Sequence, residues 1–547
     1  MFQLYIYSFL AVFLFTPLGS FFLKSDKNDS EFFSYQLIFG IILISFIALL
    51  INFFFPLNTL INSFLLILST YIIIKNSKVY LSKSYFFYSI LSSLIIFILI
   101  AESNTYRPDA GLYHLPYINI LHHEKIVLGL SNLHFRFGHI SIIQYFSAIS
   151  DNILFGLNGI VLAPAMLSSA IIINFLSIFL KKIKQNKYDI EFYFIFAILI
   201  FVSYKLNRYS NYGNDGPAHF LYYFLVLQIL IINKDFNFHK YSNTYLLSAF
   251  IFMNKLTLSI ACLIPLILLN KKLFYKLILT KKIYFITIFT SLWLLKNILV
   301  SGCLIYPVTS TCFEKLHWTD IKTARYISTE NEAWAKNWPD SKLGLNHKEY
   351  IKDFNWLSDW KKNYFSKFLK ILIPYILFLF LIYCYINLTK EKQNIKISKK
   401  IYLLFLPIII SLFIWFFKFP ILRYGQSFII TFFALIFAIL CSKYLITNEK
   451  KNIFIVIIII ASLAFISKNV LRIHQTSNDY FNYPWPKFYS IGEDNVPGDL
   501  KEIIINNKKF YKVSNGSCMY SKPMCSGFER PFNTKKLHSY LILYRDK

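Results

Sequence analysis

The sequence predicts an all-α polytopic membrane protein with about 14 transmembrane helices. Of its 547 residues, 56% are hydrophobic, and the mean hydropathy is +0.49. Uncharged runs recur along the chain, for example at residues 41–55, 88–101 and 453–466. With their neighbours these runs reach the roughly 20 residues that a membrane-spanning helix requires. A soluble core does not need apolar runs of this length, so a soluble globular fold is excluded.

The formal net charge of +29 would suggest nucleic-acid binding in a soluble protein. Here the lysines cluster in the links between apolar runs, where the positive-inside rule places them on the cytoplasmic side. These clusters lie at residues 75–83, 181–187, 271–282, 390–400 and 450–451. We therefore expect no nucleic-acid partner. A smaller basic excess on the other face can serve anionic membrane lipids.

Residues 1–101 are predicted to form an N-terminal membrane region. Four helices are expected, near residues 2–20, 35–55, 58–75 and 85–101. The first apolar stretch lacks the basic residues that begin a signal peptide, so it counts as a membrane helix. Because the links that follow the first and third helices are basic, the fourth helix is expected to end on the outer, periplasmic-type side.

Residues 102–160 are predicted to form a polar outer loop. Its first part, residues 102–139, holds six charged residues and five histidines. Two amphipathic helices are expected along the membrane surface, at residues 111–124 and 135–149, because their apolar residues are mixed with Tyr and His. A Gly–Asn turn at residues 129–132 separates these two helices.

Residues 161–300 are predicted to return to the membrane. They contain a second outer loop at residues 205–217 and a pair of short spans at about 243–253 and 256–270. Asn254 and Lys255 lie at the junction of this pair, where they are expected to face outward or to sit at shallow depth.

Residues 301–366 form the third expected outer segment, which holds five of the eight tryptophans. These tryptophans either stack on sugar faces or mark the membrane interface, where tryptophan is common. Residues 367–467 close the membrane region with further helices and one short outer turn at residues 418–425.

Residues 468–547 are predicted to form a small α/β unit on the outer side. A helix is expected near residues 498–506, with strands at residues 509–513 and 539–544. The cysteines support an outer location for the polar segments. Two pairs of cysteines lie close together in sequence, Cys303 with Cys312 and Cys518 with Cys525. They predict two disulfides in an oxidising compartment, the alternative being four free thiols.

Several common signatures are absent from the sequence. No GxGxxG lies between a strand and a helix, and neither GxxxxGK[ST] nor HExxH occurs. No segment is long and polar enough for a soluble domain that would use a sugar nucleotide. If the protein transfers sugars, its donor is therefore expected to be a lipid-linked phosphate sugar met at the outer face.

The outer loops supply candidate chemistry. A carboxylate can deprotonate an acceptor hydroxyl or hold a divalent metal, and a basic side chain can bind a leaving phosphate. The candidate carboxylates are Glu102, Asp109 and Asp215, and the candidate basic residues are Arg208, Lys418 and Arg423. Each has a structural alternative: interface position for Glu102, helix capping for Asp109, turn formation for Asp215, and snorkelling for the late basic pair. The five histidines fit no tight metal-ligand spacing, which favours packing and hydrogen bonding.

Four motifs carry a resemblance to known membrane proteins. They are DAGLYHLP at residues 109–116, GLSNLHFRFG at 129–138, SGCLIYP at 301–307 and FPILRYG at 419–425. In its arrangement, with an acidic residue in the first outer loop, two surface helices behind it and a multi-span body, the chain resembles the GT-C superfamily of polyprenyl-phosphate-sugar-dependent glycosyltransferases. More narrowly, the motifs look like those of an uncharacterised bacterial family linked to surface-polysaccharide gene clusters. The likeness covers about residues 100–430, although the spans before the first loop depart from the usual superfamily arrangement.

The resemblance implies an integral-membrane glycosyltransferase of the bacterial inner membrane. It would move a sugar from a polyprenyl-phosphate-linked donor to a cell-envelope glycan or lipid acceptor on the periplasmic face. Asp109 would be the base or a metal ligand, and Glu102 or Asp215 would assist it or hold a metal, with Mg²⁺ or Mn²⁺ as the candidate ion. Phosphate contacts would come from Arg208, Lys418 and Arg423, and the acceptor site would be shaped by His114, His134 and Arg136. Three alternatives stay open: a polysaccharide polymerase or ligase, a flippase or transporter, and a non-catalytic envelope protein.

Overall fold

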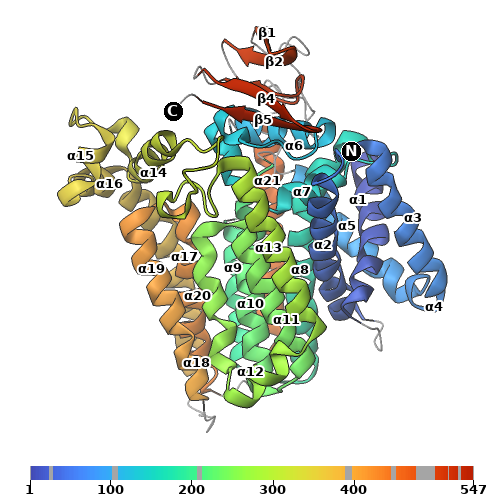
Figure 1. Cartoon of the computed structure of the whole chain (residues 1–547). Helices are drawn as coiled ribbons and strands as arrows, with labels where there is room; N and C mark the ends of the chain where they lie inside the picture. Colours follow the sequence, from blue (N-terminus) through green and yellow to red (C-terminus); the bar gives the residue numbers. More distant parts are fainter. Residues whose placement is uncertain are drawn as a thin grey trace.

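The computed structural model describes residues 2–23, 29–101, 109–205, 212–388, 397–444, 451–475, 499–514, 517–527 and 531–545. In these residues the chain is mainly helical, with short strands near the C-terminus (Figure 1). The helices of the first half are α1 (Phe2–Phe15), α2 (Ser30–Asn52), α3 (Thr59–Lys75), α4 (Ser77–Tyr80), α5 (Lys83–Ala101), α6 (Leu115–His123), α7 (Ile143–Ile149), α8 (Gly159–Lys184), α9 (Ile190–Tyr204), α10 (Asp215–Lys234) and α11 (Phe238–Asn254). The later helices are α12 (Lys271–Ile278), α13 (Lys281–Ser301), α14 (Ile321–Ala335), α15 (His347–Ile351), α16 (Leu357–Trp360), α17 (Ser366–Asn387), α18 (Lys399–Leu403), α19 (Phe405–Lys418), α20 (Leu422–Cys441) and α21 (Lys451–Gln475).

The helical, multi-pass class is confirmed, whereas the count of about 14 spans is not. Among the described residues, nine helices are long and apolar enough to cross a membrane, or up to ten with one bent pair. That pair joins Leu256–Leu268 to Lys271–Ile278 at an angle of 115°. Three further apolar helices have only 10–17 residues: Thr59–Lys75, Ile190–Tyr204 and Asn452–Lys468. The predicted number of spans exceeds the number of long helices because the prediction also counts short and broken segments.

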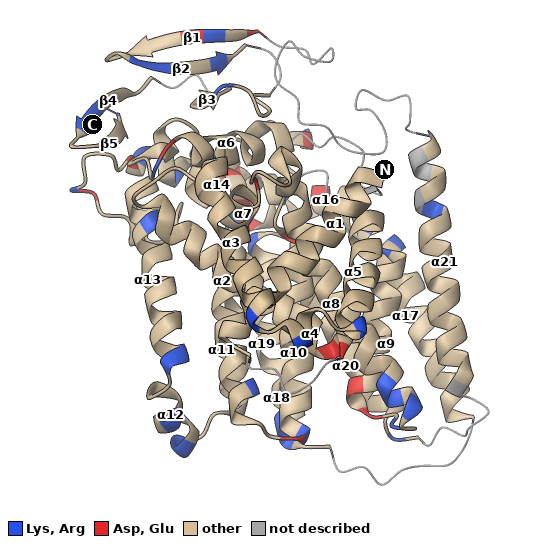
Figure 2. Cartoon of the chain, turned by 90° about the vertical axis from the view of Figure 1, so that its right-hand side faces the viewer, with Lys and Arg blue, Asp and Glu red and all other residues tan. Residues whose placement is uncertain are grey.

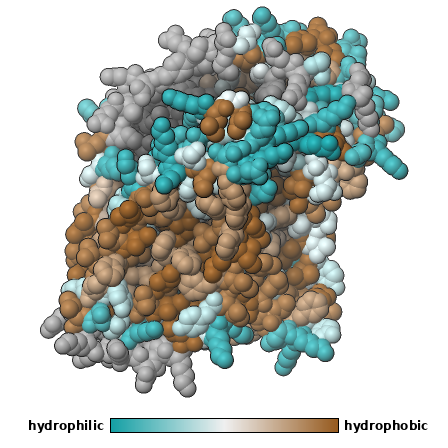
Figure 3. Space-filling model, turned by 90° about the vertical axis from the view of Figure 1, so that its left-hand side faces the viewer, coloured by the Kyte–Doolittle hydropathy of each residue, from teal (hydrophilic) through white to brown (hydrophobic). Residues whose placement is uncertain are grey.

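The surface of the bundle is divided into bands. Figure 3 shows a broad apolar band around the middle of one face, with hydrophilic side chains above and below it. Helices α17 and α19 carry apolar side chains that are more than half exposed, namely Leu377, Phe380, Leu381, Leu406 and Phe413. Exposure of so many large apolar side chains is expected where lipid replaces water. Helices α8 and α10, by contrast, are mostly buried in the interior of the bundle.

The two ends of the bundle differ in charge and covering. The lysine-rich end, at the bottom of Figures 1 and 2, carries α12 and α18. Its lysines include Lys181, Lys182, Lys234, Lys271, Lys272, Lys281, Lys282, Lys399 and Lys400. The opposite end lies beneath the C-terminal strands and is called the strand-capped end below (Figure 1).

Both helical segments predicted along the membrane surface are present at the strand-capped end, and most of their residues are buried. The first is a π-helical turn, Ala110–His114, that continues into α6. The second divides into a 3₁₀ turn, Phe135–His139, and α7, in which every residue is buried. The C-terminal tail covers α6, because His122 hydrogen-bonds Tyr520 at 2.6 Å and Asn119 donates to the carbonyl of Ser521.

The tail is built from strands, and the helix predicted near residues 498–506 is wrong. Strands β1 (Leu500–Ile505) and β2 (Lys508–Val513) pair antiparallel, and β3 (Cys525–Ser526) pairs parallel with β2. Strands β4 (Asn533–Leu537) and β5 (Tyr540–Tyr544) form a separate hairpin. Asn506 and Asn507 both have positive φ, as a two-residue hairpin turn requires, and the isoleucines before them favour a strand. The strands predicted at residues 509–513 and 539–544 are confirmed.

The β4–β5 hairpin is joined to the first loop through backbone contacts. The amide of Leu128 donates to the carbonyl of Leu541 at 2.9 Å, and the amide of Leu543 donates to the carbonyl of Leu128 at 2.8 Å. Arg545 adds an ion pair with Asp320 at 3.0 Å and a hydrogen bond to the carbonyl of Asn132 at 2.9 Å. The last strand is thus an integral part of the strand-capped end.

Only glycine fits at position 129, where the β4–β5 hairpin meets the first loop. Its φ is +69°, and a Cβ atom there would collide with the carbonyl oxygen of Leu543. We expect Gly129→Ala to loosen the tail, at a cost of about 1–3 kcal/mol in stability. Limited proteolysis should release the tail faster than in the wild type. Gly344→Ala is the matched control, since Gly344 also has positive φ but has open space around it; equal protection of both variants would contradict the prediction.

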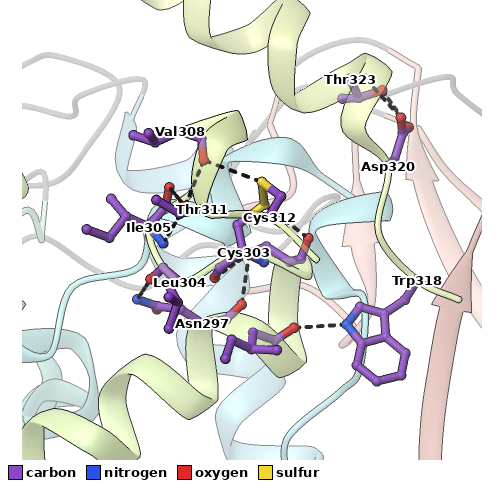
Figure 4. Close-up of a disulfide and its surroundings, with 12 residues drawn as sticks. Asn297, Cys303, Leu304, Ile305, Val308, Thr311, Cys312, Trp318, Asp320 and Thr323 are labelled. Atoms are coloured by element: carbon purple, nitrogen blue, oxygen red, sulfur yellow. Dashed lines mark hydrogen bonds between the residues drawn. A yellow bond between two sulfur atoms is a disulfide. The ribbon is translucent and has the colours of Figure 1, made fainter. Parts of the chain in front are cut away.

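Both expected cysteine pairs are joined in the structure. Cys303 and Cys312 close the turn that follows α13 (Figure 4). Asn297 donates to the carbonyl of Leu304 at 2.9 Å within the same turn. Cys518 and Cys525 close the loop that covers α6. Both disulfides lie at the strand-capped end, whereas the three free cysteines, Cys262, Cys384 and Cys441, lie in helical segments of the bundle.

Candidate functional site

Four charged side chains from separate parts of the chain meet in one network. Arg423 lies at its centre: its Nη1 is 3.6 Å from Asp109 Oδ2, and its Nε is 3.1 Å from Asp215 Oδ2. The other carboxylate oxygen of Asp215 pairs with Lys255 Nζ. Arg423 also donates from Nη2 to the hydroxyl of Tyr424 at 3.0 Å, and Lys255 lies 4.9 Å from the centre of the Tyr424 ring. We call these four charged residues the Arg423 network.

The helix ends explain how the network is assembled. Asp215 is the first residue of α10, and Arg423 is the second residue of α20. Helix α11 ends at Asn254, and the extended backbone of Lys255 turns its side chain toward Asp215. Asn214 donates to the carbonyl of Asn254 at 2.6 Å, so the starts and ends of neighbouring helices are tied together.

His219 fixes α10 against α20 just below the network. Its Nε2 lies 2.9 Å from the carbonyl oxygen of Arg423, and its Nδ1 lies 2.5 Å from the hydroxyl of Ser427. The carbonyl can only accept, so Nε2 carries the proton, and Nδ1 accepts from Ser427. This buried bridge holds the backbone of Arg423 while leaving its guanidinium free to pair.

Exposure increases across the network from one side to the other. The side chains of Lys255 and Asp215 are 6% and 18% exposed, whereas those of Asp109 and Arg423 are 31% and 47% exposed. A buried ion pair is costly to break, but an exposed one contributes at most about 1 kcal/mol. The Asp109–Arg423 contact can therefore be displaced by an anion, while the Asp215–Lys255 pair keeps Arg423 in position.

Aromatic and basic residues of the first loop surround Asp109. The Arg136 guanidinium lies 4.9 Å from the centre of the Tyr113 ring, and the charges of Asp109, Arg136 and Arg423 all act on Tyr113. Burial raises the pKa of Tyr113 above its usual value of 10.0. His114 hydrogen-bonds Gln144 through Nδ1, and burial lowers the pKa of His114 to about 4. Both side chains are therefore neutral at pH 7.

His134 has a structural position beside this group. Its Nδ1 accepts from the backbone amide of Arg136 at 3.1 Å, so it begins the 3₁₀ turn that carries Arg136. Burial, followed by the charge of Arg136, lowers the pKa of His134 to about 3. Of the predicted acceptor-site residues, His114 and Arg136 thus adjoin the network, and His134 supports Arg136.

Helix capping was the structural alternative for Asp109, and turn formation was the alternative for Asp215. Asp109 occupies the position before the π-helical turn, yet its side chain makes no capping hydrogen bond. Asp215 begins a helix, and its carboxylate is in ion pairs with Lys255 and Arg423. Glu102 and Arg208, the other two candidates from the first two outer loops, lie outside the described residues.

Lys418 belongs to a different cluster from Arg423. Its Nζ pairs with Glu332 of α14 at 2.9 Å, and Glu332 also pairs with the buried Lys336 at 2.6 Å. Lys336 in turn lies 4.7 Å from the centre of the Trp356 ring. Lys418 thus connects the end of α19 to the tryptophan-rich segment.

Two of the five tryptophans in that segment are buried and cannot stack on a sugar. Trp356 and Trp360 are only 1% and 8% exposed, and Trp360 donates to the carbonyl of Pro420 at 2.6 Å. Trp415 donates to the carbonyl of Ile421 at 2.8 Å. These indole rings fix the chain that leads into Arg423. Trp334, which is 53% exposed, is the exception in this cluster.

The sequence reasoning missed Lys255, Tyr424 and His219 as site residues. The sequence pattern places Lys255 only at the junction of two short spans. An ionisable residue inside an apolar region is by default a functional candidate, and this signal could have identified Lys255. Tyr424 and His219 carry no comparable signal, because their roles depend on contacts between α10 and α20.

The described residues were compared with the arrangement that a metal site requires. Among the residues that the structure describes, no group of three or more His, Cys, Asp or Glu side chains is arranged around a common point. The histidines of the first loop have other contacts. His123 bonds the carbonyl of Asn119 at 2.9 Å, and His139 packs against Tyr306 with ring centres 5.3 Å apart.

The neutral state of buried His114 predicts how stability depends on pH. The pKa is about 4 in the folded protein and 6.5 when the side chain is free, so the unfolded state binds the proton first. Its contribution is therefore lost as pH falls from about 6.5 to 4, by up to about 3 kcal/mol. His114→Gln should flatten the pH dependence of the unfolding midpoint in this window, whereas His538→Asn, in the exposed β4–β5 turn, should not. Parallel pH profiles for wild type and His114→Gln would contradict the prediction.

The fold and the site together define a multi-pass membrane protein with a charged network at one end of its helical bundle. Residues 1–430 match the model of a family described as a domain of unknown function, DUF8201, and the chain belongs to this family. The matched region contains all four residues of the Arg423 network. No curated protein and no solved structure matches the chain.

Proposed function

We propose that this protein is an integral-membrane glycosyltransferase that uses a polyprenyl-phosphate-linked sugar and acts on a cell-envelope glycan or lipid acceptor. The Arg423 network is the observation that carries this proposal. It offers a partly exposed carboxylate, Asp109, beside a guanidinium that a buried ion pair keeps in position. Sugar transfer from a lipid phosphate needs these two groups, one to take a proton and one to stabilise a leaving phosphate.

The proposed reaction begins when the donor phosphate displaces Asp109 from Arg423. Bidentate arginine–phosphate pairing is stronger than the long, exposed contact of 3.6 Å that it replaces. The freed Asp109 carboxylate takes the proton of the acceptor hydroxyl as that oxygen bonds to the anomeric carbon. The bond between this carbon and the phosphate oxygen breaks, and its electron pair leaves with the polyprenyl phosphate, whose charge Arg423 stabilises.

Other residues would position the reactants. Asp215 and Lys255 hold Arg423, and the group of Tyr113, His114 and Arg136 lies on the side from which an acceptor would approach Asp109. Asp109 and Asp215 also carry oxygen ligands of the kind that Mg²⁺ and Mn²⁺ prefer. A divalent ion would neutralise phosphate charge there, and it forms part of the proposal as a candidate cofactor.

The proposed location is the bacterial inner membrane, with the strand-capped end in the periplasm. Lysines occur on the strands of the tail too, but at the opposite end they gather in the short links between helices, and the positive-inside rule counts such links, which supports a cytoplasmic position for that end. Both disulfides lie at the strand-capped end, which supports an oxidising compartment there. The proposed count of about 14 crossings adds α3, α9, α11, α21 and the 3₁₀ segment before α12 to the nine long helices.

A second candidate is a polysaccharide polymerase or ligase. The central place of Arg423, which contacts both carboxylates, favours it, because such a reaction would depend on this arginine more than on Asp109. Arg423→Lys keeps the charge but loses the bidentate geometry. A larger loss of activity in Arg423→Lys than in Asp109→Asn would favour the polymerase or ligase.

The direct test is transfer by the purified protein in lipid nanodiscs. Synthetic polyprenyl-phosphate sugars are supplied with envelope glycan or lipid acceptors, and released polyprenyl phosphate is measured by mass spectrometry. We expect release that requires both the acceptor and the protein. Absence of release with every donor, together with an unchanged surface glycan in a strain that lacks the gene, would refute the proposal.

A further inference from the structure

A cavity of about 880 Å³ lies at the lysine-rich end, far along the bundle from the Arg423 network. It is bounded by the start of α2, the ends of α8 and α10, and the starts of α11 and α13. Helix α12, which precedes α13, lies at the same end of the bundle (Figures 1 and 2). The cavity is as large as those that bind small organic ligands, and the Arg423 network makes no use of it.

The inner wall of this cavity carries a buried amide. Gln228 of α10 is 2% exposed and lines the cavity, and its side chain has no hydrogen-bond partner among the residues that the structure describes. Neither polar atom of this amide is among those sealed off without a partner, so the amide is reached from the cavity and can hydrogen-bond a group placed there. Gln228 therefore marks a place for a polar ligand group within an otherwise apolar wall that includes Ile178, Ile231 and Phe285.

The rim of the cavity carries two lysines without an acidic partner and two acidic residues that already have partners. Lys240 and Lys281 are exposed, and within the described residues neither forms an ion pair. The acids are already engaged: Asp29 caps α2 by accepting from the amide of Phe32 at 2.8 Å, and Glu31 pairs with Lys181 at 2.9 Å. The available charge at the rim is thus positive.

Lys282, which also lines the cavity, joins two of the helices that form its wall. Its ammonium group donates to the carbonyl of His239 and to the hydroxyl of Ser242, both at 3.2 Å, and also to Asn243. These bonds tie the start of α13 to the start of α11. They hold Lys240, which follows His239 in α11, and Lys281, which precedes Lys282 in α13, on the same rim.

We propose that this cavity binds a membrane phospholipid with an anionic headgroup. Its phosphate lies between Lys240 and Lys281, a hydroxyl of the headgroup reaches Gln228, and its acyl chains follow Phe22 and Phe285 toward the apolar band. Basic pockets between transmembrane helices at the cytoplasmic interface suit anionic lipid headgroups. A soluble phosphate ester shares the headgroup chemistry but would not use the apolar wall. The lipid site is independent of the proposed sugar transfer.

Lipid binding to the purified full-length protein tests the proposal. The ligands are phosphatidylglycerol, zwitterionic phosphatidylcholine and soluble glycerol 3-phosphate, and native mass spectrometry reads the bound species. The cavity variants are Lys240→Gln/Lys281→Gln and Gln228→Leu. The control, Lys271→Gln/Lys272→Gln, removes two exposed lysines from α12 at the same end but outside the cavity lining.

We expect the wild type to retain phosphatidylglycerol in preference to phosphatidylcholine, with about tenfold weaker binding in the Lys240→Gln/Lys281→Gln variant. Gln228→Leu should also bind more weakly, and the control should bind as the wild type does. Three results would overturn the proposal: equal binding in wild type and the lysine variant, an equal loss in the control, or displacement of the lipid by glycerol 3-phosphate. If Gln228→Leu fails to fold, the exposed-lysine variant decides alone.

Discussion

Asp109→Asn is expected to reduce sugar transfer at least about a hundredfold while the protein folds normally. Asparagine is nearly isosteric with aspartate but cannot accept a proton from the acceptor hydroxyl at neutral pH. Folding should be unaffected, because Asp109 is partly exposed and makes no capping hydrogen bond. The measurements are release of polyprenyl phosphate by the purified variant and the surface glycan profile of a strain that carries it.

Asp353→Asn provides the matched control for this substitution. Asp353 is an exposed aspartate of the segment between α15 and α16, and its replacement removes the same charge. Its left-handed backbone, with φ of 47°, also accepts asparagine readily. We expect wild-type transfer from this variant. A normal glycan profile in Asp109→Asn, at a wild-type level of protein, would remove Asp109 from the proposed reaction.

Asp215→Asn is expected to lower the free energy of unfolding by about 3–5 kcal/mol. The substitution leaves the buried Lys255 ammonium, 6% exposed, beside Arg423 without the carboxylate that separates the two charges. The double variant Asp215→Asn/Lys255→Met removes the uncompensated charge and should recover most of the loss. Denaturation in mixed micelles, followed by tryptophan fluorescence, measures the single variants and the double variant.

The coupling between the two positions decides whether this ion pair is buried and structural. Additive effects of Asp215→Asn and Lys255→Met would contradict the network, because contacting residues are expected to couple. Glu502→Gln is the comparison, since Glu502 and Lys509 form an ion pair between solvent-exposed side chains on β1 and β2. Its loss should leave the unfolding midpoint unchanged.

The membrane helices are the part of the fold that sequence patterns predict best. Within lipid each helix must satisfy its own backbone hydrogen bonds, so length and hydropathy are enough to locate it. Helices α2 and α5, for example, lie within a few residues of the predicted ranges 35–55 and 85–101. The prediction weakens where the segment is short or broken, as at Leu256–Leu268, whose 3₁₀ backbone has no distinctive pattern.

The polar segments were predicted less well, because their partners are distant in sequence. Mixed Tyr, His and apolar residues in α6 fit an exposed amphipathic helix equally well. Burial follows from partners distant in sequence: Ser521 and Tyr520 of the tail contact Asn119 and His122, and α7 packs against α6 from the other side of the loop. The β1–β2 hairpin is a different case. Its turn has a local signal in the sequence, because Asn506 and Asn507 lie between β-branched and aromatic residues.

The sequence by itself determined the multi-pass membrane class and the kinds of chemistry available, including Asp109, Asp215 and Arg423 as candidates. These conclusions need only composition, local pattern and the ionisation of single side chains. Only the tertiary structure decided that Arg423 contacts both carboxylates, that Lys255 completes the network and that Lys418 belongs elsewhere. The physical reason is that ion pairing and burial depend on distances of a few ångströms between helix ends, and the packing of α10, α11 and α20 sets those distances.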